Sequence, residues 1–118
     1  MLRTLGLLAL GAEFFNGGLG QTKRAEHHVK QAEQAGLPVK PEFIRACGWT
    51  MVGASVALQI PFLRRPAALL LAAMLVPITY IGHPFWKMED AGERRRHETN
   101  FLKNVSMFGG ALFVAGSG

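Results

Sequence analysis

Four apolar segments alternate with polar segments along the 118 residues of this chain. The apolar segments cover residues 4–20, 43–63, 66–82 and 101–116. As helices they would measure roughly 24 to 32 Å, close to the ~30 Å hydrocarbon core of a bilayer. The pattern therefore predicts a single all-α domain over residues 1–118, an integral membrane bundle of four spanning helices.

The first two connections differ in length. Residues 22–35 contain good helix formers, and Gly36 and Pro38 follow them. This order predicts a short amphipathic helix at the membrane surface that stops before Gly36. The second connection is the tight polar turn at 64–66, which ends in a proline suited to the first turn of the next helix.

The third connection, residues 83–100, is long and carries most of the remaining charge. Tyr80 and Trp86 lie where the third span would leave lipid, the layer in which aromatic residues with a polar tip are enriched. We therefore expect this connection to lie at the water–lipid boundary. The first segment resembles a secretory signal in its apolarity, but its basic start is thin, with only Arg3, so we expect a retained span.

The net charge is +5, and the bases are unevenly distributed. They lie beside apolar runs and are not interleaved with aromatic residues, which argues against a nucleic-acid partner. The first and third connections carry Lys23, Arg24, Lys30, Lys40, Lys87, Arg94, Arg95, Arg96 and Lys103, whereas the opposite side has Arg3, Arg64 and Arg65. Since positive loops stay in the cytoplasm, both termini should face outward. We expect Arg94, Arg95 and Arg96 to anchor to lipid headgroups.

Small residues recur along the spans and predict close helix packing. In the second span Ala46, Thr50 and Ala54 follow one another at intervals of four, as do Gly53 and Ala57. We expect these positions to face other helices.

Metal and haem chemistry find little support in the sequence. The single cysteine, Cys47, lies in an apolar run, where an inert thiol is expected. His27 and His28 are adjacent, so they point to different faces of a helix and do not suit a metal site. His83 and His97 lie at or beyond the membrane boundary, which does not suit axial ligation of a transmembrane haem.

Glu13 is the sharpest chemical feature, because it lies near the middle of the first span. A charged carboxylate there costs roughly 2.5–3.5 kcal/mol and usually faces protein or water. It could relay protons or bind a quinone headgroup. Alternatively, it could fix helix packing as a neutral or paired carboxyl, with Asn16, Thr50 or Gln59 as its partner.

Three sequence elements resemble those of a known family. "HPFW" at 83–86 and "FLKNVSMFGG" at 101–110 are similar to the "H-x-F-W … F-L-K-N-x-x-x-x-G-G" ending of the DoxX family of small bacterial membrane proteins, and "AGLP" at 35–38 is similar to its Gly-x-Pro element. The resemblance implies four spans in the bacterial cytoplasmic membrane. It also implies a link to thiosulfate oxidation and quinone reduction.

Two functions follow as expectations. The first is a non-catalytic accessory subunit of a larger membrane redox complex, without activity of its own. The second is the quinone-binding subunit of a thiosulfate- or thiol-linked quinone oxidoreductase. In that case Glu13, His83, Trp86 and Asn104 are the candidates for a quinone or polar site. We expect a quinone or a lipid as the ligand and no metal.

Overall fold

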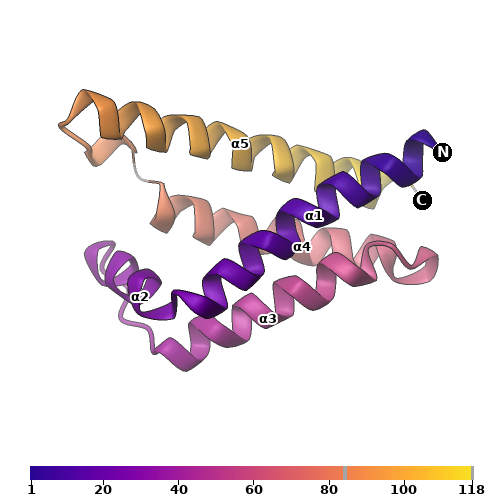
Figure 1. The fold of residues 1–118 in the computed structure, drawn as a ribbon, viewed down its shortest axis with the longest axis horizontal. Coiled ribbons are helices and arrows are strands. Elements are labelled where there is room, and N and C mark those ends of the chain that lie inside the picture. The colour runs from indigo at the N-terminus through magenta and orange to yellow at the C-terminus, as the bar shows by residue number, and fades with distance from the viewer. Residues whose placement is uncertain (84, 118) are drawn as a thin grey trace.

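The computed structural model describes residues 1–83 and 85–117, and within them it is helical without strands. Pro84 of the "HPFW" motif lies outside the described residues. The elements are α1 (Leu2–Lys23), α2 (Ala25–Gln34), α3 (Pro41–Ala57), η1 (Pro61–Leu63), α4 (Arg64–Gly82), η2 (Phe85–Lys87) and α5 (Ala91–Gly116) (Figure 1). The prediction of an all-α fold is confirmed.

The four long helices run alternately in opposite directions. Figure 1 shows α1 and α4 running from the end that carries both termini to the far end, and α3 and α5 running back. α1 packs mainly against α3, and α4 mainly against α5, while α3 and α4 join the two pairs. The molecule is 43 Å long and 31 by 20 Å across. The connections α2 and η2 therefore lie at the same end of the bundle.

Two predicted boundaries were wrong. α5 begins at Ala91, ten residues before the predicted start of the fourth span, because Asp90 caps it: the Asp90 carboxylate accepts a hydrogen bond of 2.9 Å from the Glu93 backbone N–H. The charged part of the third connection is thus mostly helix. α3 ends at Ala57, earlier than predicted, and η1 completes the return to α4.

The expected helix within residues 22–35 is present as α2, although its place at a membrane surface stays a prediction. It ends as the sequence indicates, since Gly36 adopts a positive φ of 82°. The backbone N–H of Leu37 then donates to the Ala32 carbonyl over 2.8 Å, which closes the last turn.

One hydrophobic core joins all four long helices. α1 contributes Leu7 and the fully buried Phe14, and α4 contributes the fully buried Leu71. The other buried members are Met51, Ala54, Leu58, Ala68, Ala72, Leu75, Ala111 and Ala115. Since five of these eight are alanines, the helices approach closely around the core.

α1 and α3 cross in close contact at two glycines. A Cβ on Gly48 would lie 2.8 Å from the Gly18 carbonyl oxygen, and a Cβ on Gly18 would lie 2.7 Å from that of Gly48. Real Cβ atoms do not come so near to backbone, so the two helices touch backbone to backbone here. Glycine at both positions is what allows this geometry.

A glutamine holds the same helix pair on each side of that crossing. Gln21 of α1, which is buried, donates to the Ile44 carbonyl of α3 over 3.0 Å. Gln59, just after α3, donates to the Leu7 carbonyl of α1 over 2.8 Å. These bonds fix the two helices against sliding, because both carbonyls belong to rigid helical backbone.

The small-residue faces predicted for the second span were largely wrong. Ala46 and Thr50 are exposed, and a Cβ on Gly53 would meet nothing within 4 Å. Ala54 is buried as expected. The face that packs against α1 is instead the one that carries Gly48 and Ser55, the latter facing Gly11 of α1.

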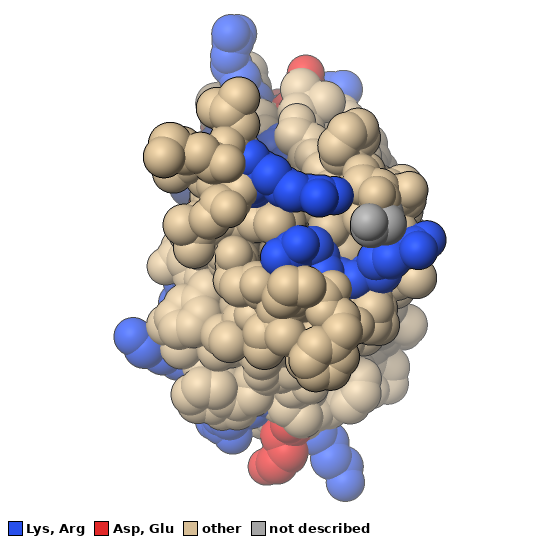
Figure 2. Space-filling model, turned by 90° about the vertical axis from the view of Figure 1, so that its right-hand side faces the viewer, with Lys and Arg blue, Asp and Glu red and all other residues tan. Residues whose placement is uncertain are grey.

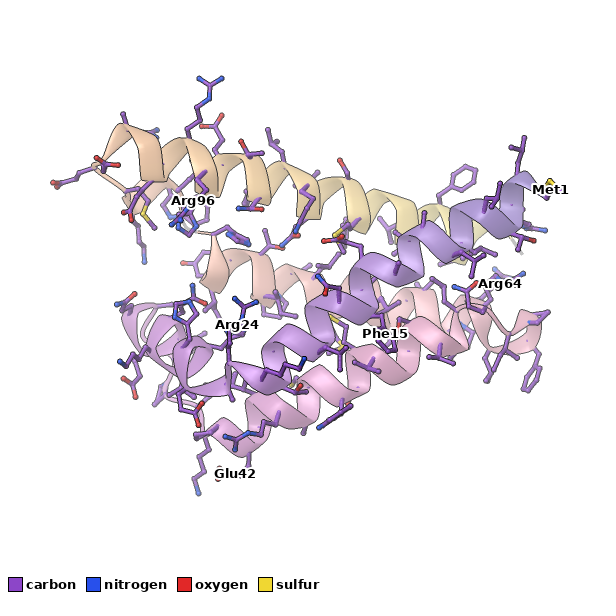
Figure 3. The ribbon with its side chains drawn as sticks, viewed as in Figure 1. Met1, Phe15, Arg24, Glu42, Arg64 and Arg96 are labelled. Atoms are coloured by element: carbon purple, nitrogen blue, oxygen red, sulfur yellow. The ribbon has the colours of Figure 1, made fainter. Side chains whose placement is uncertain are left out.

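Large apolar side chains cover the outside of all four long helices. Examples with at least a third of their surface exposed are Leu5, Leu8 and Phe15 on α1, Phe43, Trp49 and Val56 on α3, Leu69, Leu70 and Val76 on α4, and Leu102, Leu112 and Phe113 on α5. Figure 3 shows Phe15 in the middle of the bundle, with Arg24, Glu42 and Arg96 towards one end and Met1 and Arg64 towards the other. Apolar surface of this extent marks an interaction with lipid or protein.

By length and composition, one stretch of the described residues, Pro61–Lys87, is apolar enough to cross a membrane. It contains α4. Glu13 and Asn16 lower the apolar character of α1, and the charged first turns lower that of α5, whereas α3 is short, with 17 residues. Membrane crossing by each of the four long helices stays a prediction.

The glycine crossing generates a matched pair of substitutions on α3. Gly48→Ala should lower the free energy of unfolding by about 1–3 kcal/mol, because the new methyl group meets backbone that cannot move away. Gly53→Ala, five residues further along, should raise it by about 0.5–1 kcal/mol, because alanine favours the helix and its methyl group meets nothing there. Thermal or denaturant unfolding in mild detergent, followed by circular dichroism, measures both. Equal stability of the two variants would contradict the crossing.

Candidate functional site

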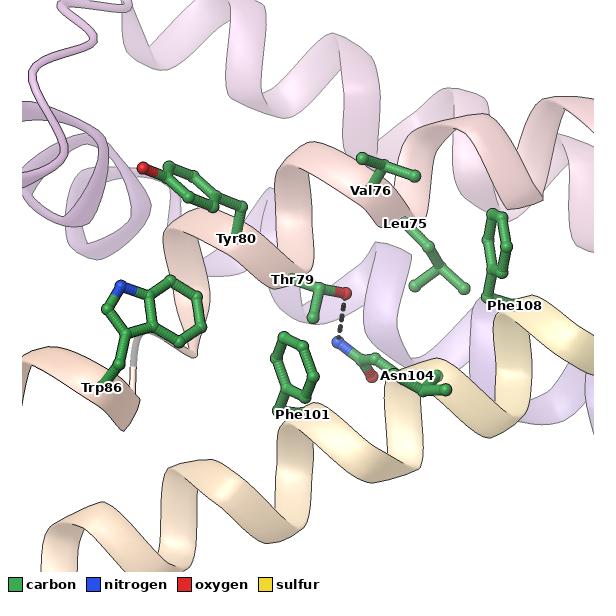
Figure 4. A pocket seen from close by; sticks show the side chains of 9 residues that line it. Leu75, Val76, Thr79, Tyr80, Trp86, Phe101, Asn104 and Phe108 are labelled. Atoms are coloured by element: carbon green, nitrogen blue, oxygen red, sulfur yellow. Dashed lines mark hydrogen bonds between the residues drawn. The ribbon is translucent and has the colours of Figure 1, made fainter.

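A pocket of about 350 Å³ lies between α4, η2 and α5. Its lining is almost wholly apolar and consists of Leu75, Val76, Thr79, Tyr80, Trp86, Phe101, Asn104, Val105 and Phe108 (Figure 4). The α5 members follow the helical spacing i, i+3, i+4 and i+7, so they form one face of that helix. A volume of this size accommodates a single ring or part of a lipid chain.

Two polar side chains of the pocket are paired with each other. The side-chain amide of Asn104 donates to the Thr79 hydroxyl oxygen over 3.1 Å, and both residues are buried (Figure 4). An amide nitrogen carries two hydrogens, so one hydrogen of Asn104 remains for another acceptor. The pocket therefore offers a hydrogen-bond donor at an otherwise apolar wall.

An aromatic cluster forms the part of the pocket nearest η2. Trp86 lies 5.7 Å from Tyr80 and 5.9 Å from Phe101, measured between ring centroids, and its ring is nearly perpendicular to that of Phe101. Phe85 makes a similar edge contact with Phe101 at 5.3 Å. Such pairs hold η2 against α4 and α5 with ring faces available to a flat ligand.

His83 lies beside this cluster and contacts a second histidine. Its Nδ1 is 3.2 Å from Nδ1 of His97 on α5. Burial, together with repulsion from the nearby His97, Lys103 and Arg96, lowers the pKa of His83 to about 4. His83 is therefore neutral at physiological pH and shares one hydrogen bond with its neighbour.

Glu13 forms an ion pair with Lys103 of α5, at 3.1 Å. The predicted partners Asn16, Thr50 and Gln59 were wrong, since Gln59 bonds to α1 backbone and Thr50 to the Ala46 carbonyl. The pair lies near the middle of α1 and of α5, and each side chain keeps nearly half of its surface exposed. The charges of Glu13 and Lys103 thus compensate each other, but neither side chain is buried in the bundle.

The structure brings together only part of the candidate set. Trp86 and Asn104 line the pocket, His83 adjoins it through η2, and Glu13 lies on α1 and is not among the lining residues. Sequence reasoning missed Thr79, Phe101 and Phe108 as partners. For the last two, the spacing of Phe101, Asn104 and Phe108 on one helical face was the available signal.

The arginines divide between exposed and structural positions. Arg94, Arg95 and Arg96 are exposed in the first turns of α5, where headgroup contact stays a prediction. Figure 2 shows Lys and Arg side chains across the middle of the end that carries both termini. At that end Arg64 donates to the Leu58 carbonyl over 3.0 Å and Arg65 to the Ala115 carbonyl over 2.9 Å. Both cap the C-terminal ends of neighbouring helices.

Within residues 1–83 and 85–117 no three His, Cys, Asp or Glu side chains converge as metal ligands. The His83–His97 pair would supply two nitrogens, but Lys103 and Arg96 act on it with positive charge, which opposes a cation.

The ion pair generates a double-mutant cycle. Glu13→Gln and Lys103→Met should each lower the free energy of unfolding by about 1–3 kcal/mol, because each leaves one charge on a largely apolar surface. The double variant should lose less than the sum. Unfolding in mild detergent measures all three.

The same cycle on Glu26 and Arg45, paired at 2.9 Å between α2 and α3, is the control. That pair lies among polar residues at the bundle end, so about 0–1 kcal/mol is expected. Strict additivity at Glu13 and Lys103 would show that their pairing contributes nothing.

No curated protein and no solved structure matches this chain. A family does match: the family described as DoxX covers residues 3–84, from α1 through the end of α4. The match stops before α5. The "FLKN" element and all the pocket residues of that helix therefore lie beyond the matched region. Because the matched region exceeds half of the chain, the protein belongs to the DoxX family, a family of small membrane proteins.

Proposed function

We propose that this protein crosses the bacterial cytoplasmic membrane four times, with α1, α3, α4 and α5 as the spans. The exposed apolar side chains on every long helix support this, because lipid is the solvent that would cover them. The length of 43 Å agrees with the ~40–45 Å thickness of a bilayer including its headgroups. Glu13 and Lys103, the charges at mid-depth, are paired.

Both termini face outward in this arrangement. Eight of the nine bases assigned to the first and third connections lie on the cytoplasmic side, while Lys103 is paired with Glu13 at mid-depth and Arg3, Arg64 and Arg65 lie on the outer side. Arg64 and Arg65 also donate hydrogen bonds to carbonyls at helix ends, which reduces their effect on the orientation of the protein in the membrane.

The pocket suggests a ligand that arrives through the membrane. A quinone ring combines flat apolar faces with carbonyl acceptors. The ring of Trp86 or that of Phe101, which are nearly perpendicular, suits one of these faces, and the free hydrogen of the Asn104 amide suits a carbonyl. This pocket is the observation that carries the proposal, and it favours the quinone-binding alternative over a purely accessory role.

The protein serves as the quinone-binding subunit of a larger membrane redox complex. Electrons from thiosulfate or a thiol would enter on a partner chain, and this chain would hold the quinone without catalysing its reduction alone. Membership of a complex is supported by the half-exposed Glu13–Lys103 pair, which a polar side chain of a partner helix would solvate better than lipid.

Topology can be tested with reporters. Alkaline phosphatase fused to either terminus should be active, and green fluorescent protein at the same positions should be dark, because both termini face the periplasm. Fusions after Gly36, in the first connection, should show the opposite result. Active phosphatase after Gly36 together with inactive terminal fusions would invert the orientation.

The quinone proposal predicts a difference between two asparagines of α5. Asn104→Leu should weaken the binding of a short-tailed benzoquinone by about tenfold, since it removes the donor in the pocket. Asn100→Leu is the matched control, because Asn100 bonds to the Arg96 carbonyl outside the pocket. Quinone quenching of tryptophan fluorescence in nanodiscs measures affinity, and lipid extraction of the purified protein shows whether quinone is retained.

If the protein co-purified with a stoichiometric partner but neither retained nor bound quinone, the quinone-binding proposal would be contradicted. The role of a non-catalytic accessory subunit would then remain. Equal affinities of the two variants would place a bound quinone elsewhere.

A further inference from the structure

The His83–His97 contact ties the end of α4 to α5 directly beside the pocket. His83 is the residue at which α4 ends, and its backbone N–H donates to the Thr79 carbonyl over 3.0 Å. Its carbonyl accepts from the Phe85 N–H at 2.9 Å, which is the first residue of η2. The position of His83 is therefore transmitted to η2, and η2 carries Trp86 into the pocket wall.

The hydrogen bond between the two rings exists in some protonation states and not in others. Two Nδ1 atoms 3.2 Å apart bond when one carries a hydrogen and the other a lone pair. A neutral pair satisfies this, and so does a pair that shares one added proton. A second added proton makes both nitrogens donors, which removes the bond and sets two positive charges side by side.

The surrounding positive charges make the addition of that second proton energetically unfavourable. Lys103 and Arg96 of α5 act on His83 with the same sign as His97, and Glu13 of α1 reaches this cluster through its ion pair with Lys103. Double protonation therefore drives His83 away from α5. The remaining ties of η2 to α5 are the ring contacts of Phe85 and Trp86 with Phe101.

We propose that the His83–His97 hydrogen bond is a proton-controlled tether that holds Trp86 against the ligand pocket, so that acidification on this side of the bundle opens the pocket and releases its ligand. The tether regulates the pocket and so rests on the proposed quinone binding. Its movement, however, occurs with or without a ligand.

The direction of the pH dependence follows from His83. The pKa falls from its ordinary 6.5 to about 4 in the tethered structure. The tethered state is thus fully favoured above pH 6.5 and loses its advantage as the pH falls towards 4, because the released state binds the proton more tightly. Quinone affinity should drop by about tenfold between about pH 7.5 and about pH 5, a figure reduced for the partial exposure of His83.

Trp86 itself reports the tether. The chain has two tryptophans, so Trp49→Phe leaves Trp86 as the single emitter. In nanodiscs without quinone, the acrylamide quenching constant of Trp86 should rise about twofold on acidification as the ring leaves the wall. Combined with His97→Asn, the constant should stay flat, because asparagine offers an acceptor to a protonated His83 and adds no charge.

His27→Asn, on the exposed face of α2, is the matched control and should keep the full rise. His83→Asn should be flat like His97→Asn, and monodisperse elution of both shows that they fold. A flat profile in the parent, or the same rise in His97→Asn, overturns the tether. Quinone affinity that ignores pH while Trp86 moves overturns its regulatory role. Absence of quinone binding at about pH 7.5 contradicts the proposed function instead, and the pH-dependent movement of Trp86 is then still a valid result.

Discussion

The backbone contact of α1 with α3 at Gly18 and Gly48 is the constraint on which the rest of the bundle depends. It sets the rotation of α1, and that rotation points Leu7 and Phe14 into the core shared with α4 and α5. The same rotation directs Glu13 towards α5, where Lys103 meets it. If α1 were held further out by side chains at the crossing, Gln21 and Gln59 could not reach their carbonyls, and the ion pair would be left open. One close contact therefore positions both the core and the mid-depth charges.

The structure places polar groups according to what can satisfy them, not according to distance from its centre. Large apolar side chains face outward, while Thr79, Asn104, Gln21 and Ser55 are buried with hydrogen-bond partners. This arrangement suits an environment that cannot form hydrogen bonds, because an unpaired donor in lipid finds no water as an acceptor. It also explains the small pocket. Exposing the face of an aromatic ring to lipid or to a flat ligand costs little free energy. The Thr79–Asn104 pair at the pocket wall would fix the orientation of such a ligand.

Hydrophobic patterning predicted the number and approximate place of the long helices, and α4 follows its predicted segment closely. It failed at α5, where ten further residues, most of them polar, join the helix because Asp90 caps it and its first turns are exposed. It also failed to choose among the glycines. Gly48 packs and Gly53 does not, and that depends on how α3 is rotated against α1, which no local pattern records. The partner of Glu13 lies 90 residues away, so its identity required the fold. Family resemblance pointed to Trp86 and Asn104, but their joint place in one pocket comes from the helical face of α5.

Lys103 connects two polar features that the sequence presents as separate. On one side it binds Glu13 of α1, and on the other its charge acts on His83 at the end of α4. The Glu13 carboxylate offsets part of that charge, so the electrostatic field at the histidine pair depends on how tightly α1 is held against the bundle. α1 is in turn held by the glycine crossing with α3. The chain of dependence therefore runs from a backbone contact between α1 and α3, through one ion pair, to the protonation of two rings beside the pocket. A partner helix that moved α1 by a small distance would alter the protonation of His83 without touching it.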